Sequence, residues 1–444
     1  MSLRTGATAP LPDITSPPGP RAGWYHGWNI VAVGVLSQVA ANGLTYNSFT
    51  LFLRDWSVEL HTPISRLQLA VAAMTFLCAA VSPLVGIWAD RFPARRLFAC
   101  GLLGMAAFYV AMSAVTSAWQ ILALYGLLVP LALTLSTAVV VNPLVSRWFV
   151  RRRGLALGLS AFGIGMAGVL LPPLIAALLP AVGWRMIWRG GGLLTGLILM
   201  PLVVWVIRNR PTEHEGLYYL SADGNASPNR HGHAGGMGQL GWREVASRRN
   251  FWLLVAIYLP FMALYGGCAQ NLAPYVASHG LRPQSAGVLL SALSFSHVVS
   301  TLVLGLISDR FGNRLAFAGL ALVMLLGAAF FALGTGLPAI ALGCVLIGAG
   351  GGVFTLLAAA IAVEFGAAGV GRAFGLAMFF IPLMSLAPFV MAKTQEATGS
   401  YRPAIFGMAI LVAIAGALGL MLREQRGSQP PAGWEPVAPA PKIA

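Results

Sequence analysis

Two stretches, Gly86-Ile87-Trp88-Ala89-Asp90-Arg91-Phe92 and Gly305-Leu306-Ile307-Ser308-Asp309-Arg310-Phe311, share the pattern G-x-x-x-D-R-F. They lie 219 residues apart, and each of them ends a long apolar segment. A charged, turn-forming cluster that recurs at the end of equivalent apolar segments indicates a duplicated unit. The sequence therefore predicts a chain built from two related halves.

Two further pairs of segments extend this repeat. The stretch Gly154-Leu155-Ala156-Leu157-Gly158-Leu159 returns as Gly371-Arg372-Ala373-Phe374-Gly375-Leu376, and Trp184-Arg185 returns as Tyr401-Arg402. Both offsets are 217 residues, so the halves match in order and direction. Parallel repeats of this kind are related by an axis along the membrane normal.

The composition indicates a membrane protein that crosses the bilayer many times. Of the 444 residues, 57% are hydrophobic and only 9% are charged, against about 25% charged in soluble proteins. Because about 20 apolar residues span a bilayer, we expect twelve helices, near residues 27–53, 64–89, 97–116, 119–145, 154–179, 184–207, 251–278, 284–308, 315–333, 337–363, 371–393 and 401–422. The predicted domains are a disordered tail (1–26), a six-helix bundle (27–207), a linker (208–250), a second bundle (251–422) and a tail (423–444).

The basic residues set the orientation. If the amino terminus is inside, 21 of the 28 Lys and Arg lie in inner loops and tails. This bias follows the positive-inside rule and predicts two cytoplasmic termini in the cell inner membrane. The net charge is +15, but the basic residues do not form patches interleaved with aromatic residues, as a nucleic-acid-binding surface would. We therefore expect no nucleic-acid partner. The four cysteines lack C-x-x-C spacing, and the pair His231 and His233 fits a solvated turn, so we expect no metal or cofactor.

These motifs resemble the major facilitator superfamily, whose G-x-x-x-D-R loop lies between the second and third helices and between the eighth and ninth. The segment Trp148–Leu159 resembles its monocarboxylate transporter and oxalate–formate exchanger branch, as do Tyr25-His26-Gly27-Trp28 and Phe251-Trp252. The resemblance covers roughly residues 24–422. It implies an all-α membrane fold of twelve helices in two six-helix pseudo-symmetric halves, and secondary transport by alternating access.

The chain departs from this branch in its eighth helix. Animal monocarboxylate transporters carry an Asp and, four residues on, an Arg at positions that fall here on His297 and Thr301. The oxalate exchanger uses basic residues in helices 8 and 11, but helix 11 has none here before Lys393. Pro93 also replaces the usual loop glycine, which Gly312 keeps in the second copy. The missing cations weaken the case for lactate-like and oxalate substrates.

His297 is the one histidine deep in a predicted span. It lies 12 residues before Asp309, which places it about 18 Å from the inner face and close to the midplane. Ionisable groups at this depth are costly and usually functional. One hypothesis is that His297 binds a polar group of the substrate or carries the coupled proton, because histidine titrates near neutrality. The alternative is a neutral histidine hydrogen-bonded to Ser294 or Thr301.

By resemblance, helices 1, 4, 7 and 10 line the cavity. Their amides and phenols can orient a ligand by hydrogen bonding, although each could equally join two helices. The candidate substrate-binding residues are His297, Thr301, Asn42, Tyr46, Asn47, Tyr265, Gln270, Asn271 and Asn142, with His297 also the candidate for proton coupling.

The two D-R pairs are candidates for a cytoplasmic gate. In relatives, such charges pair with neighbouring loops in one conformation and separate in the other, which is the two-state behaviour that alternating access needs. We therefore expect Asp90, Arg91, Asp309 and Arg310 to close the cytoplasmic side. The alternative is that they only set the topology.

The sequence favours transport over catalysis. It has no G-x-x-x-x-G-K-[ST] loop for ATP and no nucleophile–base pair in its spans. We therefore expect that the protein is not an enzyme. The predicted function is proton-coupled uptake of a monocarboxylate or aromatic acid by a monomer in the bilayer. The alternatives are uptake of an uncharged heterocycle or vitamin such as riboflavin, or efflux of an amphipathic compound.

Overall fold

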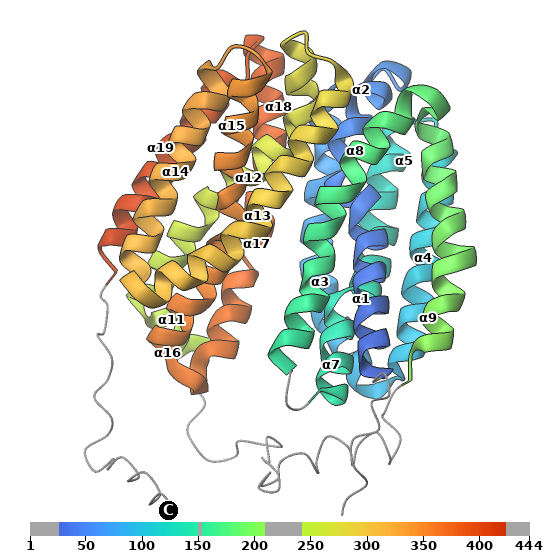
Figure 1. Ribbon diagram of the computed structural model, residues 1–444, viewed down its shortest axis with the longest axis horizontal. Coiled ribbons are helices and arrows are strands. Elements are labelled where there is room, and N and C mark those ends of the chain that lie inside the picture. Colours follow the sequence, from blue (N-terminus) through green and yellow to red (C-terminus); the bar gives the residue numbers. More distant parts are fainter. Residues whose placement is uncertain (1–25, 150–152, 209–241, 423–444) are drawn as a thin grey trace, which may run out of the picture.

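The computed structural model describes residues 26–149, 153–208 and 242–422, and every regular element in these ranges is a helix. Figure 1 shows two helical bundles side by side, one formed by the first half of the chain and the other by the second. The predicted tails and most of the predicted linker lie outside the described residues, so these domain boundaries stay predictions.

The first bundle contains six spans, several of them interrupted. Span one combines three elements because a π-helical turn breaks it. In chain order the elements are α1 (His26–Asn42), η1 (Gly43–Asn47), α2 (Phe49–Glu59), α3 (Ile64–Arg91), α4 (Ala94–Ser113), α5 (Ala118–Ala123), η2 (Leu124–Leu128), α6 (Val129–Ser136), α7 (Ala138–Trp148), α8 (Arg153–Leu193), η3 (Leu194–Leu199) and α9 (Met200–Val206).

The second bundle follows a short helix, α11 (Trp242–Ser247). Its elements are α12 (Arg249–Ser278), α13 (Pro283–Phe311), α14 (Asn313–Leu333), α15 (Leu337–Gly348), η4 (Ala349–Gly352), α16 (Val353–Met378), α17 (Ile381–Met384), α18 (Ala387–Thr398) and α19 (Arg402–Leu420). α16 contains the end of the tenth span and the start of the eleventh.

The number of spans agrees with the sequence once two irregularities are considered. Ten helices in the described ranges are long and apolar enough to cross a membrane. One of them, residues 158–206, contains two spans, because Gly183 leaves the helical conformation with φ 73°. The first span is divided between α1 and α2 and is not among the ten. The predicted twelve-helix architecture is therefore confirmed.

The repeat predicted from Trp184-Arg185 and Tyr401-Arg402 is visible in the packing. The Arg185 guanidinium donates a hydrogen bond of 2.9 Å to the main-chain oxygen of Ser113, at the end of the third span. In the other half the Arg402 guanidinium donates one of 2.9 Å to the main-chain oxygen of Ala332, at the end of the ninth span. Each arginine thus joins the last helix of its bundle to the end of the third.

Small residues bring the two bundles together toward the predicted outer end. α8 packs along α13, and α3 packs against α18. A Cβ atom added at Gly287 of α13 would lie 2.6 Å from the main-chain oxygen of Pro172 and 2.6 Å from the Cβ of Ala176, both in α8. Small side chains let helices approach closely within a bilayer. In Figure 1 the bundles meet near α2 and α18 and separate toward α7 and α16.

We expect Gly287→Leu to open the predicted outer end, because an overpacked contact costs about 1–3 kcal/mol. Thr50 is a suitable reporter, since it is 1% exposed and its hydroxyl accepts a hydrogen bond from the Ala273 main chain of the other half. In a background without native cysteines, Thr50→Cys should react about fivefold faster with an impermeant maleimide. Gly319→Leu is the control, because nothing lies within 4 Å of its Cβ position. Equal rates in both variants would contradict the expectation.

Candidate functional site

A cavity of about 240 Å³ lies between the two bundles. Both halves contribute to it, with five lining residues from the first and six from the second. Among these described residues none carries a formal charge. They are Asn42, Tyr46, Val71, Thr75, Ile164, Met262, Tyr265, Gly266, Met384, Ser385 and Pro388. We call this cavity the central pocket.

The irregular first span brings two of its polar groups to the central pocket. Asn42 ends α1, and its amide donates a hydrogen bond of 3.0 Å to the main-chain oxygen of Gln38. Tyr46 lies in the π-helical turn η1, which follows directly. Turns of this type occur often at functional sites, because the extra residue changes the direction of the side chains that follow. Both residues were predicted as substrate-binding from the sequence.

Tyr265 connects the central pocket with His297. Tyr265 lines the pocket from α12, and its hydroxyl lies 3.1 Å from Nδ1 of His297 on α13. The two rings meet edge to face with centroids 5.3 Å apart. A Cβ atom at Gly351 of η4 would overlap the imidazole, so only glycine leaves room for the ring there. The His297 ring therefore lies between Tyr265 of the seventh span and Gly351 of the tenth span.

The hydrogen-bond partner of the His297 side chain differs from both partners that the sequence suggested. The Thr301 hydroxyl donates a hydrogen bond of 2.9 Å to the main-chain oxygen of His297. The His297 imidazole is hydrogen-bonded to the Tyr265 hydroxyl instead. Ser294 faces Gly168 of the other half, where a Cβ atom would overlap its hydroxyl. Neither Thr301 nor His297 is among the residues that line the central pocket.

A layer of amides joins the halves beside the pocket. Gln68 of α3 donates hydrogen bonds to the main-chain oxygen of Gln270, at 2.8 Å, and to Oδ1 of Asn271, at 3.4 Å. Gln270 in turn donates to the main-chain oxygen of Tyr46, at 3.1 Å. Gln270 and Asn271, both predicted to bind substrate, thus connect helices instead of lining the pocket. Asn47, also predicted to bind substrate, is not among the lining residues and donates within the first span to the main-chain oxygen of Asn42, at 3.4 Å.

A carboxylate of the second half also binds the first half, at the start of α3. Glu396 of α18 accepts hydrogen bonds from the main-chain N–H of Ser65, at 2.9 Å, and from its hydroxyl, at 2.7 Å. Ser65 lies in the first turn of α3, where main-chain N–H groups have no partner within the helix. Glu396 therefore acts as a helix cap supplied by the opposite bundle, and the attraction between a carboxylate and a helix amino terminus adds to it.

Comparison with known proteins identifies the family. The model of the Major Facilitator Superfamily matches residues 35–388 and 267–444. The chain belongs to this superfamily. The membership predicted from the two G-x-x-x-D-R loops is thereby confirmed, and the protein is a multi-pass membrane transporter by family.

Individual relatives are distant. The oxalate:formate antiporter of Oxalobacter formigenes is 25% identical over 64% of this chain and 64% of its own length. Monocarboxylate transporter 12 of Mus musculus is 24% identical over 67% of this chain and 63% of its own length. The chain thus spans less than two thirds of both. A crystal structure of a bacterial homolog of the human lysosomal transporter Spinster matches 91% of this chain and 97% of its own, with a TM-score of 0.71 and 14% identity, which supports the major facilitator fold.

The other predicted residues that the structure describes, Asn142, Arg91 and Arg310, do not line the central pocket. Asn142 is exposed on α7 and is not among the pocket residues. Arg91 and Arg310 are exposed near the ends of α3 and α13. The side chains of Asp90 and Asp309 lie outside the described part of the structure. The cytoplasmic gate of this major facilitator protein therefore stays a prediction.

The spans that line the central pocket differ in part from those expected. The first and seventh contribute, but the described lining residues include none from the fourth or tenth, and the second, fifth and eleventh take part. Thr75 and Ser385 were not predicted. Each hydroxyl donates to a main-chain oxygen of its own turn, Thr75 to Val71 at 2.8 Å and Ser385 to Pro382 at 2.6 Å. Serine and threonine hydroxyls in apolar helices commonly bond to the main chain of their own helix, so their presence in the sequence does not indicate a binding site.

We expect Glu396→Ala to shift the protein toward a state that is open at the predicted outer end. Losing a helix cap costs about 1 kcal/mol, which changes the ratio of closed to open molecules about fivefold. Spin labels at Arg66→Cys and Thr398→Cys report the distance between the outer ends by double electron–electron resonance. Gln395→Ala, one residue away, is the control. A distance distribution that is the same in all three proteins would show that Glu396 does not hold the halves together.

Proposed function

We propose that this major facilitator protein imports a small, largely apolar monocarboxylate or aromatic acid together with a proton, by alternating access. The observation that carries the proposal is a charge-free pocket shared by both halves, with the Tyr265–His297 pair at its side. The distribution of basic residues supports two cytoplasmic termini in the cell inner membrane. A monomer is part of the same proposal.

The lining of the central pocket suits a small solute with an apolar body and one polar end. Its volume of about 240 Å³ is below the range of about 300–1,000 Å³ that is typical of sites for drug-sized ligands. Val71, Ile164 and Met262 supply apolar surface, while Tyr46 and Tyr265 supply hydroxyls. The small volume supports a simple aromatic acid over a multi-ring compound.

The neutral character of the described residues that line the central pocket supports coupling to a proton. A carboxylate moved into a low-dielectric pocket without a cation is strongly disfavoured. A proton carried with it removes this penalty, and in this proposal His297 holds that proton. When protonated, His297 donates from Nδ1 to the Tyr265 oxygen, 3.1 Å away, and the phenol proton is then free to point at the carboxylate. Solute and proton binding would then favour each other.

A second candidate function is the import of an uncharged heterocycle. The same charge-free lining favours it, since amides and phenols satisfy a neutral ligand without any proton. The two candidates differ in their response to a pH gradient, because only the acid needs a proton to enter the pocket.

Uptake into proteoliposomes distinguishes the candidates. Because benzoic acid also crosses a bilayer unaided, the comparison is with protein-free liposomes. In an outside-acid gradient we expect benzoate to enter faster with the protein present, and a protonophore to abolish the accumulation. Lactate, oxalate and a neutral heterocycle are the comparison solutes. Accumulation of the neutral compound with no response to the gradient would favour the second candidate. Failure to move any member of the panel would contradict the proposal.

Substitutions separate the roles of His297 and Tyr265. We expect His297→Gln to lose gradient-driven uptake but to retain exchange at equal pH, because exchange needs no net proton movement. Tyr265→Phe should weaken solute affinity about tenfold, since it leaves a polar group of a buried ligand without its partner. Tyr401→Phe, far from the pocket at the start of α19, is the control. Unchanged uptake and pH dependence in His297→Gln would refute its role.

A further inference from the structure

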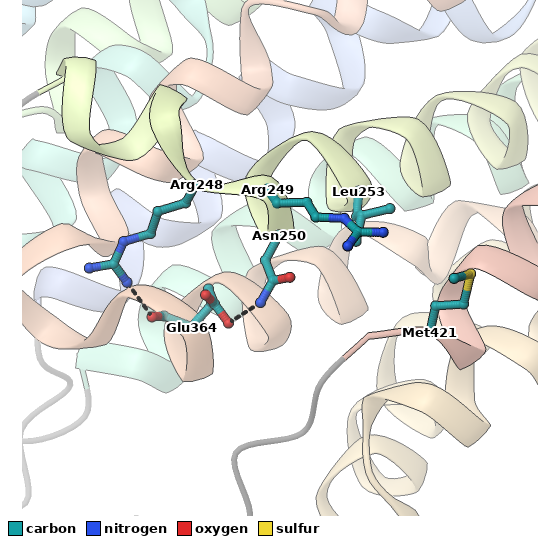
Figure 2. Close-up of a pocket in the computed structure, with 6 residues that line it drawn as sticks. All are labelled: Arg248, Arg249, Asn250, Leu253, Glu364 and Met421. Carbon is teal, nitrogen blue, oxygen red and sulfur yellow. Dashed lines mark hydrogen bonds between the residues drawn. The ribbon is translucent and has the colours of Figure 1, made fainter.

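A second cavity, of about 500 Å³, lies at the predicted cytoplasmic end of the second bundle. Its lining comes from the segment that opens α12, from α16 and from the residue that follows α19, so it does not lie between the halves. The lining residues are Arg248, Arg249, Asn250, Leu253, Glu364 and Met421. We call this cavity the basic pocket (Figure 2).

Glu364, the one carboxylate among the described lining residues of the basic pocket, accepts its hydrogen bond from a neutral amide. Asn250 donates a hydrogen bond of 2.9 Å to the Glu364 carboxylate. Arg248 donates to the main-chain oxygen of Glu364, at 3.4 Å, and its guanidinium lies over the Phe365 ring, 5.4 Å from the centroid. In Figure 2 the Arg249 side chain extends away from Glu364. The described lining residues carry two guanidinium groups and one carboxylate, so the pocket keeps a net positive charge.

The surroundings of the basic pocket place it at the surface of the bilayer. Trp252, in the first turn of α12, is 48% exposed, and its indole N–H donates to the main-chain oxygen of Ala246, at 2.7 Å. Exposed tryptophans at the ends of spanning helices mark the level of the lipid headgroups. Met421 is 58% exposed and adds apolar surface beside the arginines. A ligand that fits here carries an anionic group next to an apolar one.

We propose that the basic pocket binds the phosphodiester of an anionic phospholipid headgroup, with Arg249 as its principal ligand. Guanidinium groups bind phosphate oxygens through paired hydrogen bonds. Leu253 and Met421 would contact the glycerol and the first methylene groups of the lipid. Because anionic lipids are enriched in the cytoplasmic leaflet and basic pockets between helices attract them, the ligand is available at this level. Bound lipid would hold the ends of α12, α16 and α19 together.

Thermal unfolding of the purified full-length protein in detergent tests the proposal without any transport assay, so it is independent of the solute. Three additives are titrated separately, namely phosphatidylglycerol, phosphatidylcholine and inorganic phosphate. We expect phosphatidylglycerol to raise Tm and phosphatidylcholine to have little effect. Arg249→Gln should weaken the apparent affinity for phosphatidylglycerol about fivefold, and Arg249→Lys should restore part of it. Arg96→Gln, an exposed arginine in the first turn of α4, should bind as the wild type does.

Each outcome of this titration decides the proposal. A rise in Tm from inorganic phosphate that is lost in Arg249→Gln would support the anion site but assign it to a soluble phosphate. Equal lipid affinity in Arg249→Gln and the wild type would overturn it, as would equal loss in Arg96→Gln. If Arg249→Gln does not fold, Met421→Trp fills the pocket from a different element and should give the same loss, measured as lipid adducts by native mass spectrometry.

Discussion

The close approach of α8 and α13 is the constraint on which the arrangement of the two bundles depends. Gly287 of α13 lies against the backbone of α8, and Gly168 of α8 lies against the Ser294 side chain of α13, where larger side chains would interlock. Packing of this kind gains dispersion energy across a smooth surface, and a small rotation can break it without forcing side chains past one another. The polar contacts beside it, Gln68 with Gln270 and Glu396 with Ser65, consist of groups that water can satisfy when the halves separate.

The central pocket follows from the same arrangement. Because the two halves meet toward one end, the residues beneath that contact face each other across a space that neither half encloses alone. Charges are expensive at this depth, and the polar groups among the described lining residues are all neutral. His297 is kept one layer back, behind Tyr265 and against Gly351.

The sequence predicted the architecture better than the site. Hydrophobic length and the repeated motifs suffice for twelve spans and two halves, and the offset of 217 residues anticipates the matching bonds of Arg185 and Arg402. The site depends on how each helix is rotated and tilted against its partner, which spacing along one helix does not determine. The pocket is therefore lined by Asn42, Tyr46 and Tyr265. The side chains of Gln270 and Asn271 instead make hydrogen bonds to neighbouring helices.

Alternating exposure of the central pocket is the central claim, and Thr75, which lines it from α3, tests that claim most directly. In a cysteine-free background, Thr75→Cys can be labelled with an impermeant maleimide in right-side-out and in inside-out membrane vesicles. We expect labelling in both preparations, and slower labelling in both when the transported solute is present. Labelling from one side only, at a rate that no solute changes, would contradict a pocket that opens in turn to the two sides of the membrane.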